Sequence, residues 1–216
     1  MKLSPEDATW FAQVQGEWMR RVKPHQEPLG RHVFDVPPKL EQSAVEGATL
    51  YADRVEAMKS LPRGGCVAEV GTQTGWFAER IVDHLRPREL HLFDLSFDLL
   101  DAQRPALRAR PEVVIHHGDS SQQLALLPDG HFDWIYVDGD HGLEGVKRDA
   151  AVAVHKIKRD GILVFNDYTP WSIMELADYG VMPVVNGLLA SGEWQVRYLA
   201  LHPHMYCDIA IARRQR

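Results

Sequence analysis

Between residues 66 and 165 the chain alternates short apolar runs with segments of helical periodicity. Runs this short fit strands that are buried on both faces, and each connection is long enough for a helix that crosses back over the sheet. The alternation therefore predicts an α/β fold, with a mostly parallel, Rossmann-like sheet and helices on both faces. The runs are Cys66–Val70, Leu90–Phe93, Val113–His116, Phe132–Val137 and Gly161–Phe165, and the helical segments are Gly75–Leu85, Phe97–Ala109, Ser120–Leu127 and Leu143–Ile157.

The last part of the chain departs from this alternation. Two strand-like runs, Trp194–Leu201 and Met205–Ala212, are separated by only three residues. A connection of that length cannot carry a parallel crossover, so the two runs should be antiparallel neighbours.

The first 60 residues are predicted to form a helical extension or cap, and residues 61–216 the main domain. The segment from Ser4 to Asp7 has the order of a helix start, with a capping serine, a proline in the first turn and two acids at the positive end of the helix dipole. We expect a helix to about Arg21, a proline-rich loop over residues 22–38, and a second helix within Glu41–Ser60.

Composition excludes several function classes. The 216 residues are 45% hydrophobic and 25% charged, as in ordinary globular proteins, and the net charge of −6 comes without a basic run. A nucleic-acid partner would call for a positive footprint. The sequence has neither a signal-peptide pattern nor the roughly 18 apolar residues of a membrane span. We expect a cytoplasmic protein without nucleic-acid or membrane partners, in which Cys66 and Cys207 are reduced thiols without metal-ligand spacing.

The loop after the first apolar run has the form of a nucleoside-binding turn. Gly71 and Gly75 bound this loop, and ligands of open α/β sheets lie beyond the carboxyl ends of the strands. A dinucleotide fingerprint would have a glycine where Gln73 stands, and the lysine of a P-loop is missing. The loop therefore favours a nucleoside without phosphates. S-adenosylmethionine is such a ligand, and its positive charges suit the nearby Glu69.

Acidic residues also follow the next two strands. Asp94 stands at the spacing where a carboxylate binds ribose hydroxyls, and Asp119, which precedes Ser120, is placed to accept the adenine amino group. Three acids at successive strand ends predict one cofactor site. Its predicted members are Glu69, Gly71, Thr72, Gly75, Asp94, Asp119, Ser120 and Asp138.

A more specific pattern lies in Val137–Asp149, which begins Val-Asp-Gly-Asp-His-Gly. With this segment and the glycine loop, the chain from about Cys66 onward resembles class I S-adenosylmethionine-dependent methyltransferases. The segment itself resembles the small-molecule O-methyltransferases related to the macrocin and cephalosporin-pathway enzymes, which are similar to catechol O-methyltransferase. The resemblance implies a seven-stranded sheet with an antiparallel last strand and a small hydroxylated acceptor. It also implies cofactor roles for Glu69, Gly71, Gly75, Asp94 and Asp119.

Methyl transfer to a hydroxyl needs an aligned nucleophile and a way to remove a proton. Asp138 follows the fourth run and Asn166 and Asp167 follow the fifth, so neighbouring strand ends would form an all-oxygen cluster suited to Mg²⁺. In the resembled group the metal ligands match these three positions, with an acid more usual at Asn166. The neutral amide should lower the affinity for Mg²⁺.

His141 offers a second device, because an imidazole can remove a proton near neutral pH. In some of the resembled enzymes the matching histidine is a candidate base. His141 and Asp138 are thus the predicted catalytic residues, and an orienting role for His141 in its loop is the alternative. The sequence leaves open whether a metal ion or a general base assists the reaction.

Three other functions stay open. Methylation of an amine is disfavoured, because base amino-methyltransferases usually have an Asn/Asp-Pro-Pro-aromatic turn where this chain has the segment from Asp138 to His141. A nicotinamide-dependent oxidoreductase is disfavoured by Gln73. A non-catalytic member that binds the cofactor or a protein partner is kept open by Asn166. The N-terminal segment would cover the acceptor pocket or form a homodimer.

Overall fold

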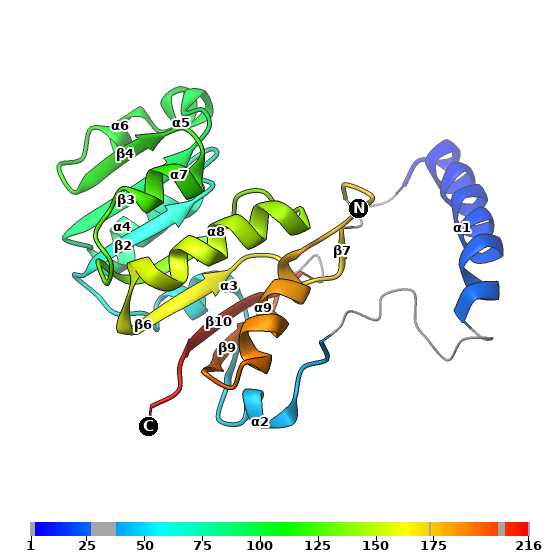
Figure 1. The fold of residues 1–216 in the computed structure, drawn as a ribbon. Helices are drawn as coiled ribbons and strands as arrows, with labels where there is room; N and C mark the ends of the chain where they lie inside the picture. The colour runs from blue at the N-terminus through cyan, green and yellow to red at the C-terminus, as the bar shows by residue number, and fades with distance from the viewer. Residues whose placement is uncertain (1–2, 27–37, 173, 203–205, 216) are drawn as a thin grey trace. The chain divides into compact units, whose positions relative to one another are not determined.

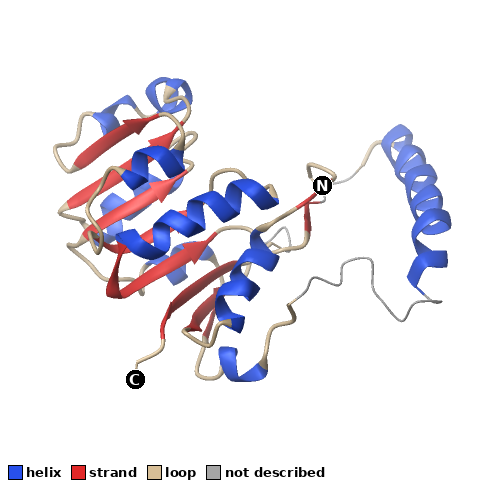
Figure 2. Cartoon of the chain, viewed as in Figure 1, coloured by secondary structure: helices blue, strands red, loops and turns tan. Residues whose placement is uncertain are grey.

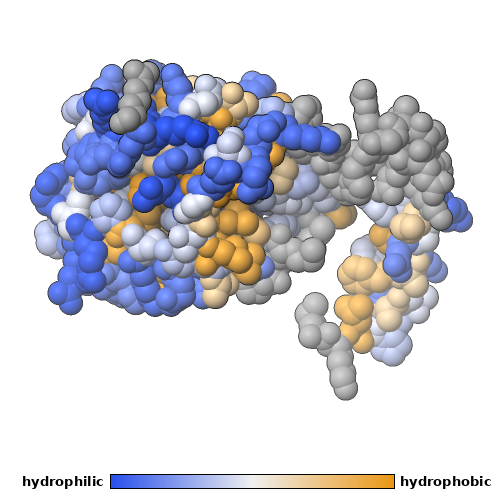
Figure 3. All heavy atoms as spheres, turned by 90° about the horizontal axis from the view of Figure 1, so that it is seen from below, coloured by the Kyte–Doolittle hydropathy of each residue, from blue (hydrophilic) through white to orange (hydrophobic). Residues whose placement is uncertain are grey.

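The structure is a computed structural model that describes residues 3–26, 38–172, 174–202 and 206–215. It divides into two compact units, residues 1–37 and residues 38–216. The first contains α1 (Pro5–Gln26), which begins as predicted, since the Asp7 N–H donates to Ser4 Oγ at 3.0 Å. The helix runs five residues beyond Arg21, and residues 27–37 of the expected loop lie outside the described residues. Large apolar side chains are exposed along α1 (Figure 3). They are Trp10, Phe11, Val14, Trp18 and Met19.

The larger unit is built around one sheet of eight strands (Figures 1 and 2). β10 is antiparallel to both of its neighbours and all other pairs are parallel. This confirms the predicted Rossmann-like sheet with an antiparallel last strand. In spatial order the strands are β1 (Thr49–Tyr51), β9 (Trp194–Ala200), β10 (Asp208–Arg213), β6 (Ile157–Phe165), β5 (Phe132–Val137), β2 (Cys66–Val70), β3 (Glu89–Asp94) and β4 (Val113–His117).

Helices cover both faces of the sheet, and each face has its own apolar core (Figure 2). Side chains of α7, α8 and α9 pack with Cys66, Ala68 and Val70 of β2, whereas side chains of α3, α4, α5 and α6 pack with Val67. This split follows from the alternation of side chains along a strand. The helices of this unit are α2 (Gln42–Val45), α3 (Arg54–Met58), α4 (Trp76–Leu85), α5 (Asp98–Gln103), α6 (Pro105–Arg108), α7 (Ser120–Ala125), α8 (Leu143–Lys156) and α9 (Val181–Ala190).

The prediction of one helix within Glu41–Ser60 is wrong. The segment forms α2, β1 and α3 instead. Gly47 interrupts the helical pattern with a φ of +78°, and Asp53 begins α3 by accepting the Val55 and Glu56 N–H groups at 2.7 and 2.9 Å. Because β1 pairs with β9, the sheet has one strand more than the seven expected, and the predicted N-terminal segment 1–60 holds both α1 and the first three elements of the larger unit.

Two further differences concern helix ends and loops. The helix expected over Phe97–Ala109 is two helices, α5 and α6, because Pro105 begins a new one. After β6, the strands β7 (Trp171–Ser172) and β8 (Ala177–Asp178) form a small hairpin before α9. Met205, the expected start of the last run, lies outside the described residues.

Among the helices described here, none is both long and apolar enough to cross a membrane.

Candidate active site

A cavity of about 440 Å³ lies at the carboxyl ends of the parallel strands. Its lining comes from the ends of β2, β3 and β5 and from the loop after β4. The chain order of the strands reverses between β2 and β5, and such a switch point is where α/β sheets bind ligands. Six predicted site residues line the cavity: Gly71, Asp94, Asp119, Ser120, Asp138 and His141.

The loop between β2 and α4 depends on its two glycines. Gly71 has a φ of +84°, and a Cβ there would lie 1.8 Å from the carbonyl oxygen of Asp138. Gly75 has a φ of +73° and precedes the first residue of α4. Only glycine adopts these conformations without strain, so the sequence brings the backbones of the loop and of the residues after β5 into direct contact.

Backbone amides position the two predicted nucleoside-binding acids. Asp94 accepts the Gln73 N–H at 2.7 Å, which ties the glycine loop to the end of β3. Asp119 accepts the Ser121 hydroxyl at 2.6 Å and the Gln122 N–H at 2.9 Å, and these bonds lower the pKa of its carboxyl. Asp119 is therefore also the cap of α7, and fixed hydrogen-bond partners hold both acids in the cavity lining.

Asp149 is a cavity residue that the sequence analysis missed. It comes from α8, is only 3% exposed, and accepts the Ser120 hydroxyl at 2.6 Å. Burial raises the pKa of its carboxyl, and the Ser120 hydroxyl opposes that shift. The sequence did hold a signal for this residue. Asp149 lies three residues after Val146 on the apolar stripe of the helix, and an acid on a buried stripe is unusual enough to mark a candidate site residue.

Three predicted cofactor residues lie outside the lining. Gly75 shapes the loop, and Glu69 and Thr72 are buried at 1% and 4% exposure. Within the part of the chain that the structure describes, Glu69 Oε2 and Thr72 Oγ1 have no hydrogen-bond partner. Burial, reinforced by the nearby Asp138 carboxyl, raises the pKa of Glu69 well above its usual value. Glu69 is thus buried next to the lining residue Val70, and its direct contact with a cofactor stays a prediction.

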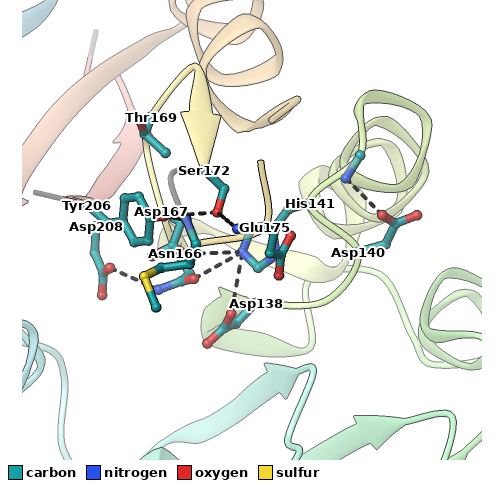
Figure 4. A network of polar contacts seen from close by, with 12 residues as sticks. Asp138, Asp140, His141, Asn166, Asp167, Thr169, Ser172, Glu175, Tyr206 and Asp208 are labelled. Atoms are coloured by element: carbon teal, nitrogen blue, oxygen red, sulfur yellow. Dashed lines mark hydrogen bonds and ion pairs between the residues drawn. The ribbon is translucent and has the colours of Figure 1, made fainter. Parts of the chain in front are cut away.

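Predicted site residues also gather around one imidazole nitrogen, and of these Asp138 and His141 line the cavity whereas Asn166 and Asp167 do not (Figure 4). His141 Nε2 lies 3.0 Å from Asn166 Oδ1, 3.6 Å from Asp138 Oδ1 and 3.9 Å from Asp167 Oδ2. Because β5 and β6 are parallel neighbours, the residues that follow them meet at one edge of the sheet, as the sequence predicted. Asp140 instead accepts the Gly142 N–H at 2.8 Å.

The hydrogen bonds of Asn166 fix the direction of its side chain. Its Nδ2 donates to Tyr136 Oη at 3.2 Å and to Asp208 Oδ1 at 3.1 Å, and Tyr136 donates to Asp208 at 2.9 Å. The Asn166 carbonyl oxygen therefore faces His141, whose Nε2 must donate to it. A neutral His141 then carries its lone pair on Nδ1. Its ring stacks on Tyr179, with 4.6 Å between the ring centroids.

Arg54 of α3 adds a cation to this cluster that the sequence analysis also missed. Its guanidinium lies 3.2 Å from Asp208 Oδ1 and 3.5 Å from Asp167 Oδ1. Burial raises the pKa of both Asp167 and Asp208, and Arg54 opposes that shift. No local pattern marks Arg54, because it reaches the cluster from the segment that was expected to be part of a helical cap.

A family model described as a methyltransferase domain matches residues 68–168. This range begins in β2 and ends just past β6, so it contains most of the cavity lining and the residues around His141. The match agrees with the resemblance stated from the sequence. No curated protein matches the sequence.

Solved structures of methyltransferases share the fold. An S-adenosylmethionine dependent methyltransferase from Mesorhizobium loti is 19% identical, with a TM-score of 0.54 over 74% of this chain and 95% of that one. An O-methyltransferase from Bacillus cereus in complex with SAH is 14% identical, with a TM-score of 0.57 over 74% and 77%. The pyocyanin biosynthetic protein PhzM is 19% identical, with a TM-score of 0.56 over 74% of this chain. The match covers 54% of PhzM, so this chain spans about half of that protein's length.

The fold, the position of the cavity and the family match lead to one assignment. The fold is shared with methyltransferases that differ widely from this chain in sequence. Residues 68–168 match a methyltransferase domain, and the chain shares the fold of S-adenosylmethionine-dependent methyltransferases.

Proposed function

We propose that this enzyme transfers the methyl group of S-adenosylmethionine to a hydroxyl group of a small metabolite. The observation that carries the proposal is the cluster of Asp138, His141, Asn166 and Asp167, of which Asp138 and His141 line the cavity. Such a cluster can orient a hydroxyl group and receive its proton.

The charge of the cavity supports the cofactor. Its acidic residues are Asp94, Asp119, Asp138, Asp140, Asp149 and Glu175, and Arg148 is the arginine beside them. The sulfonium and ammonium groups of S-adenosylmethionine are attracted to such a lining. In this proposal Asp94 receives the ribose hydroxyls, and the loop of Asp119 and Ser120 receives the adenine ring. A volume of about 440 Å³ is within the usual range for a small-molecule site.

The donor set beside the cavity has the chemistry that Mg²⁺ prefers. Asp138, Asn166 and Asp167 offer oxygen atoms, but these atoms converge on His141 Nε2, so the imidazole would have to turn away for an ion to bind there. When bound, Mg²⁺ would lower the pKa of a hydroxyl that it coordinates. Around this position the carboxylates of Asp138 and Asp167 orient the acceptor, and Arg54 limits their combined negative charge.

A metal-independent reaction is the second candidate, and the position of His141 Nε2 among the same three oxygens favours it. The N–H of His141 supplies positive character there, while its Nδ1 lone pair takes the proton of the acceptor hydroxyl. The hydroxyl oxygen then attacks the methyl carbon, the carbon–sulfur bond breaks, and S-adenosylhomocysteine leaves. Asn166 and Tyr179 hold the imidazole in place for this step.

The proposal is tested with a methyl-labelled donor and a panel of hydroxylated metabolites, each paired with the matching amine. We expect the label on oxygen, with S-adenosylhomocysteine formed in equal amount. Labelling of amines alone, or of nucleic acid or protein alone, would refute the assignment of acceptor class. The assay is run with EDTA and with added Mg²⁺ to separate the two candidates. Light scattering on the same sample tests the expected homodimer.

A further inference from the structure

A second cluster of reactive side chains lies at the amino ends of the strands, at the opposite edge of the sheet from the cavity. Cys66 and Glu89 are the first residues of β2 and β3 and are paired in register. His91 lies two residues along β3, on the same face, and His131 directly precedes β5. Since β2 lies between β3 and β5, the four side chains meet although they are spread over 66 positions of the sequence.

The four side chains lie close enough to share one ion. One ligand atom from each is within 4.8 Å of the others. Cys66 Sγ is 3.2 Å from His131 Nε2 and 3.7 Å from Glu89 Oε2, and His91 Nε2 is 3.3 Å from the same oxygen. With zinc bonds of about 2.0 to 2.3 Å, the corners of a tetrahedral site are about 3.3 to 3.6 Å apart. The observed distances need only small side-chain adjustments to reach this geometry.

The chemistry of the four ligands selects the metal. A thiolate, two imidazoles and a carboxylate suit Zn²⁺, whereas Mg²⁺ and Ca²⁺ prefer oxygen atoms alone. Among the residues that the structure describes, these four histidine, cysteine and acidic side chains are the group whose ligand atoms lie close enough together to hold a metal ion. We propose that Cys66, Glu89, His91 and His131 form a zinc site that joins the amino ends of β2, β3 and β5.

The surroundings of the cluster support this proposal. His91 Nδ1 lies 2.9 Å from His116 Nε2 on β4, so a zinc ion on Nε2 would leave the Nδ1 proton to be donated to His116. Zinc-bound histidines nearly always have such a partner. The Cys66 N–H donates to Asp133 at 2.8 Å, which holds the backbone of the first ligand. Arg88 Nε lies 3.6 Å from Glu89 Oε1 and leaves Oε2 facing the cluster.

The burial of the four residues suggests a structural site that a metal ion can reach. Cys66 is fully buried and His91 is 5% exposed, whereas the side chains of Glu89 and His131 are 40% and 25% exposed. The ion would enter from that exposed side. Four protein ligands leave no open coordination position, so the site would stabilise the sheet and not take part in methyl transfer.

The test measures metal in protein produced without a histidine tag. We expect about one zinc ion per chain. After removal of the metal, Co²⁺ should give the visible bands of a tetrahedral site and a thiolate charge-transfer band. The Cys66→Ser variant should lose that band, and Glu89→Gln and His131→Gln, at partly exposed positions, should weaken zinc binding at least tenfold. Circular dichroism verifies that each variant folds.

Matched controls separate this site from the active site. Cys207→Ser and His155→Gln remove a thiol and an exposed histidine elsewhere, and Asp138→Asn alters the catalytic cluster. All three should bind zinc as the original chain does. The proposal is overturned if the protein takes up neither zinc nor cobalt, if Asp138→Asn abolishes the binding, or if His131→Gln and Cys66→Ser leave it intact. In each case the four side chains would merely hydrogen-bond with one another.

Discussion

His141 Nε2 donates to Asn166 Oδ1 across 3.0 Å, and this contact joins the loop after β5 to the end of β6. The asparagine carbonyl thus faces His141, and its amide nitrogen donates to Tyr136 and Asp208. Asn166 therefore bridges the His141 imidazole and the buried Asp208. In the sequence it was the weakest of the three predicted metal ligands, yet its hydrogen bonds order the residues around His141.

Substitution of the predicted catalytic residues should affect turnover more than cofactor binding. We expect Asp138→Asn and His141→Gln each to lower kcat roughly a hundredfold to ten-thousandfold, as for the loss of an acid–base group. Calorimetry with S-adenosylhomocysteine should show affinities changed by less than about tenfold. Glu144→Gln, at an exposed position of α8, is the matched control. Full activity in both catalytic variants would refute their roles.

Asn166→Asp tests whether the amide is tuned for a metal-poor site. The new carboxylate cannot donate to Tyr136 and Asp208, and it adds negative charge beside Asp138 and Asp167. We expect it to lower the free energy of unfolding by about 2 to 4 kcal/mol without metal and to recover part of that loss with added Mg²⁺. Thermal melts with and without Mg²⁺ measure this. A variant as stable as the original chain in EDTA would contradict the hydrogen-bond assignment.

The raised pKa of Glu69 predicts that the free energy of unfolding depends on pH. Its pKa is raised in the folded chain, mainly by burial, so the folded state keeps a proton that the unfolded state releases above its ordinary value of 4.5. The stability linked to this proton is present below that value and is lost as the pH rises toward the folded pKa. Glu69→Gln cannot ionise, so its advantage in urea unfolding should grow from pH 5 to pH 8, by at most about 1.4 kcal/mol per unit. An advantage that does not change with pH would argue against a protonated Glu69.

Gly71 should tolerate no side chain. A Cβ would lie 1.8 Å from the Asp138 carbonyl oxygen in a backbone of positive φ, so Gly71→Ala should cost about 3 kcal/mol and weaken cofactor binding. Gly187→Ala in α9, where a Cβ meets nothing within 4 Å, should be neutral or stabilising by up to about 1 kcal/mol. Denaturant unfolding of both compares them directly. Equal stabilities would mean that the backbones of the loop and of the residues after β5 are not in contact.

The long, regular elements could be predicted from the sequence, and the short ones could not. β2 and β5 have the predicted bounds because their apolar runs are continuous and end at turn residues. β1 and α2 were missed because three or four residues cannot display a period, and β1 becomes a strand through its pairing with β9. α9 was missed because it is apolar nearly all round and shows no amphipathic stripe.

The same distinction holds for the site. The position of Gly71, Asp94, Asp119 and Asp138 in the cavity lining could be predicted, because each lies at or just after the carboxyl end of a parallel strand. Arg54, Asp149 and the partners of Cys66 depend on contacts between distant segments, which no local pattern encodes.

Calorimetry with S-adenosylmethionine on the original chain and on Asp94→Ala tests the central claim most directly. If the cavity at the switch point binds the methyl donor, the original chain should bind it saturably and NAD should give no heat of binding. Removal of the Asp94 carboxylate should weaken the affinity at least tenfold, because charge-assisted bonds to the ribose hydroxyls and the anchor of Gln73 are lost together. Binding of NAD with none of S-adenosylmethionine, or equal affinity of the two chains for the methyl donor, would contradict the account.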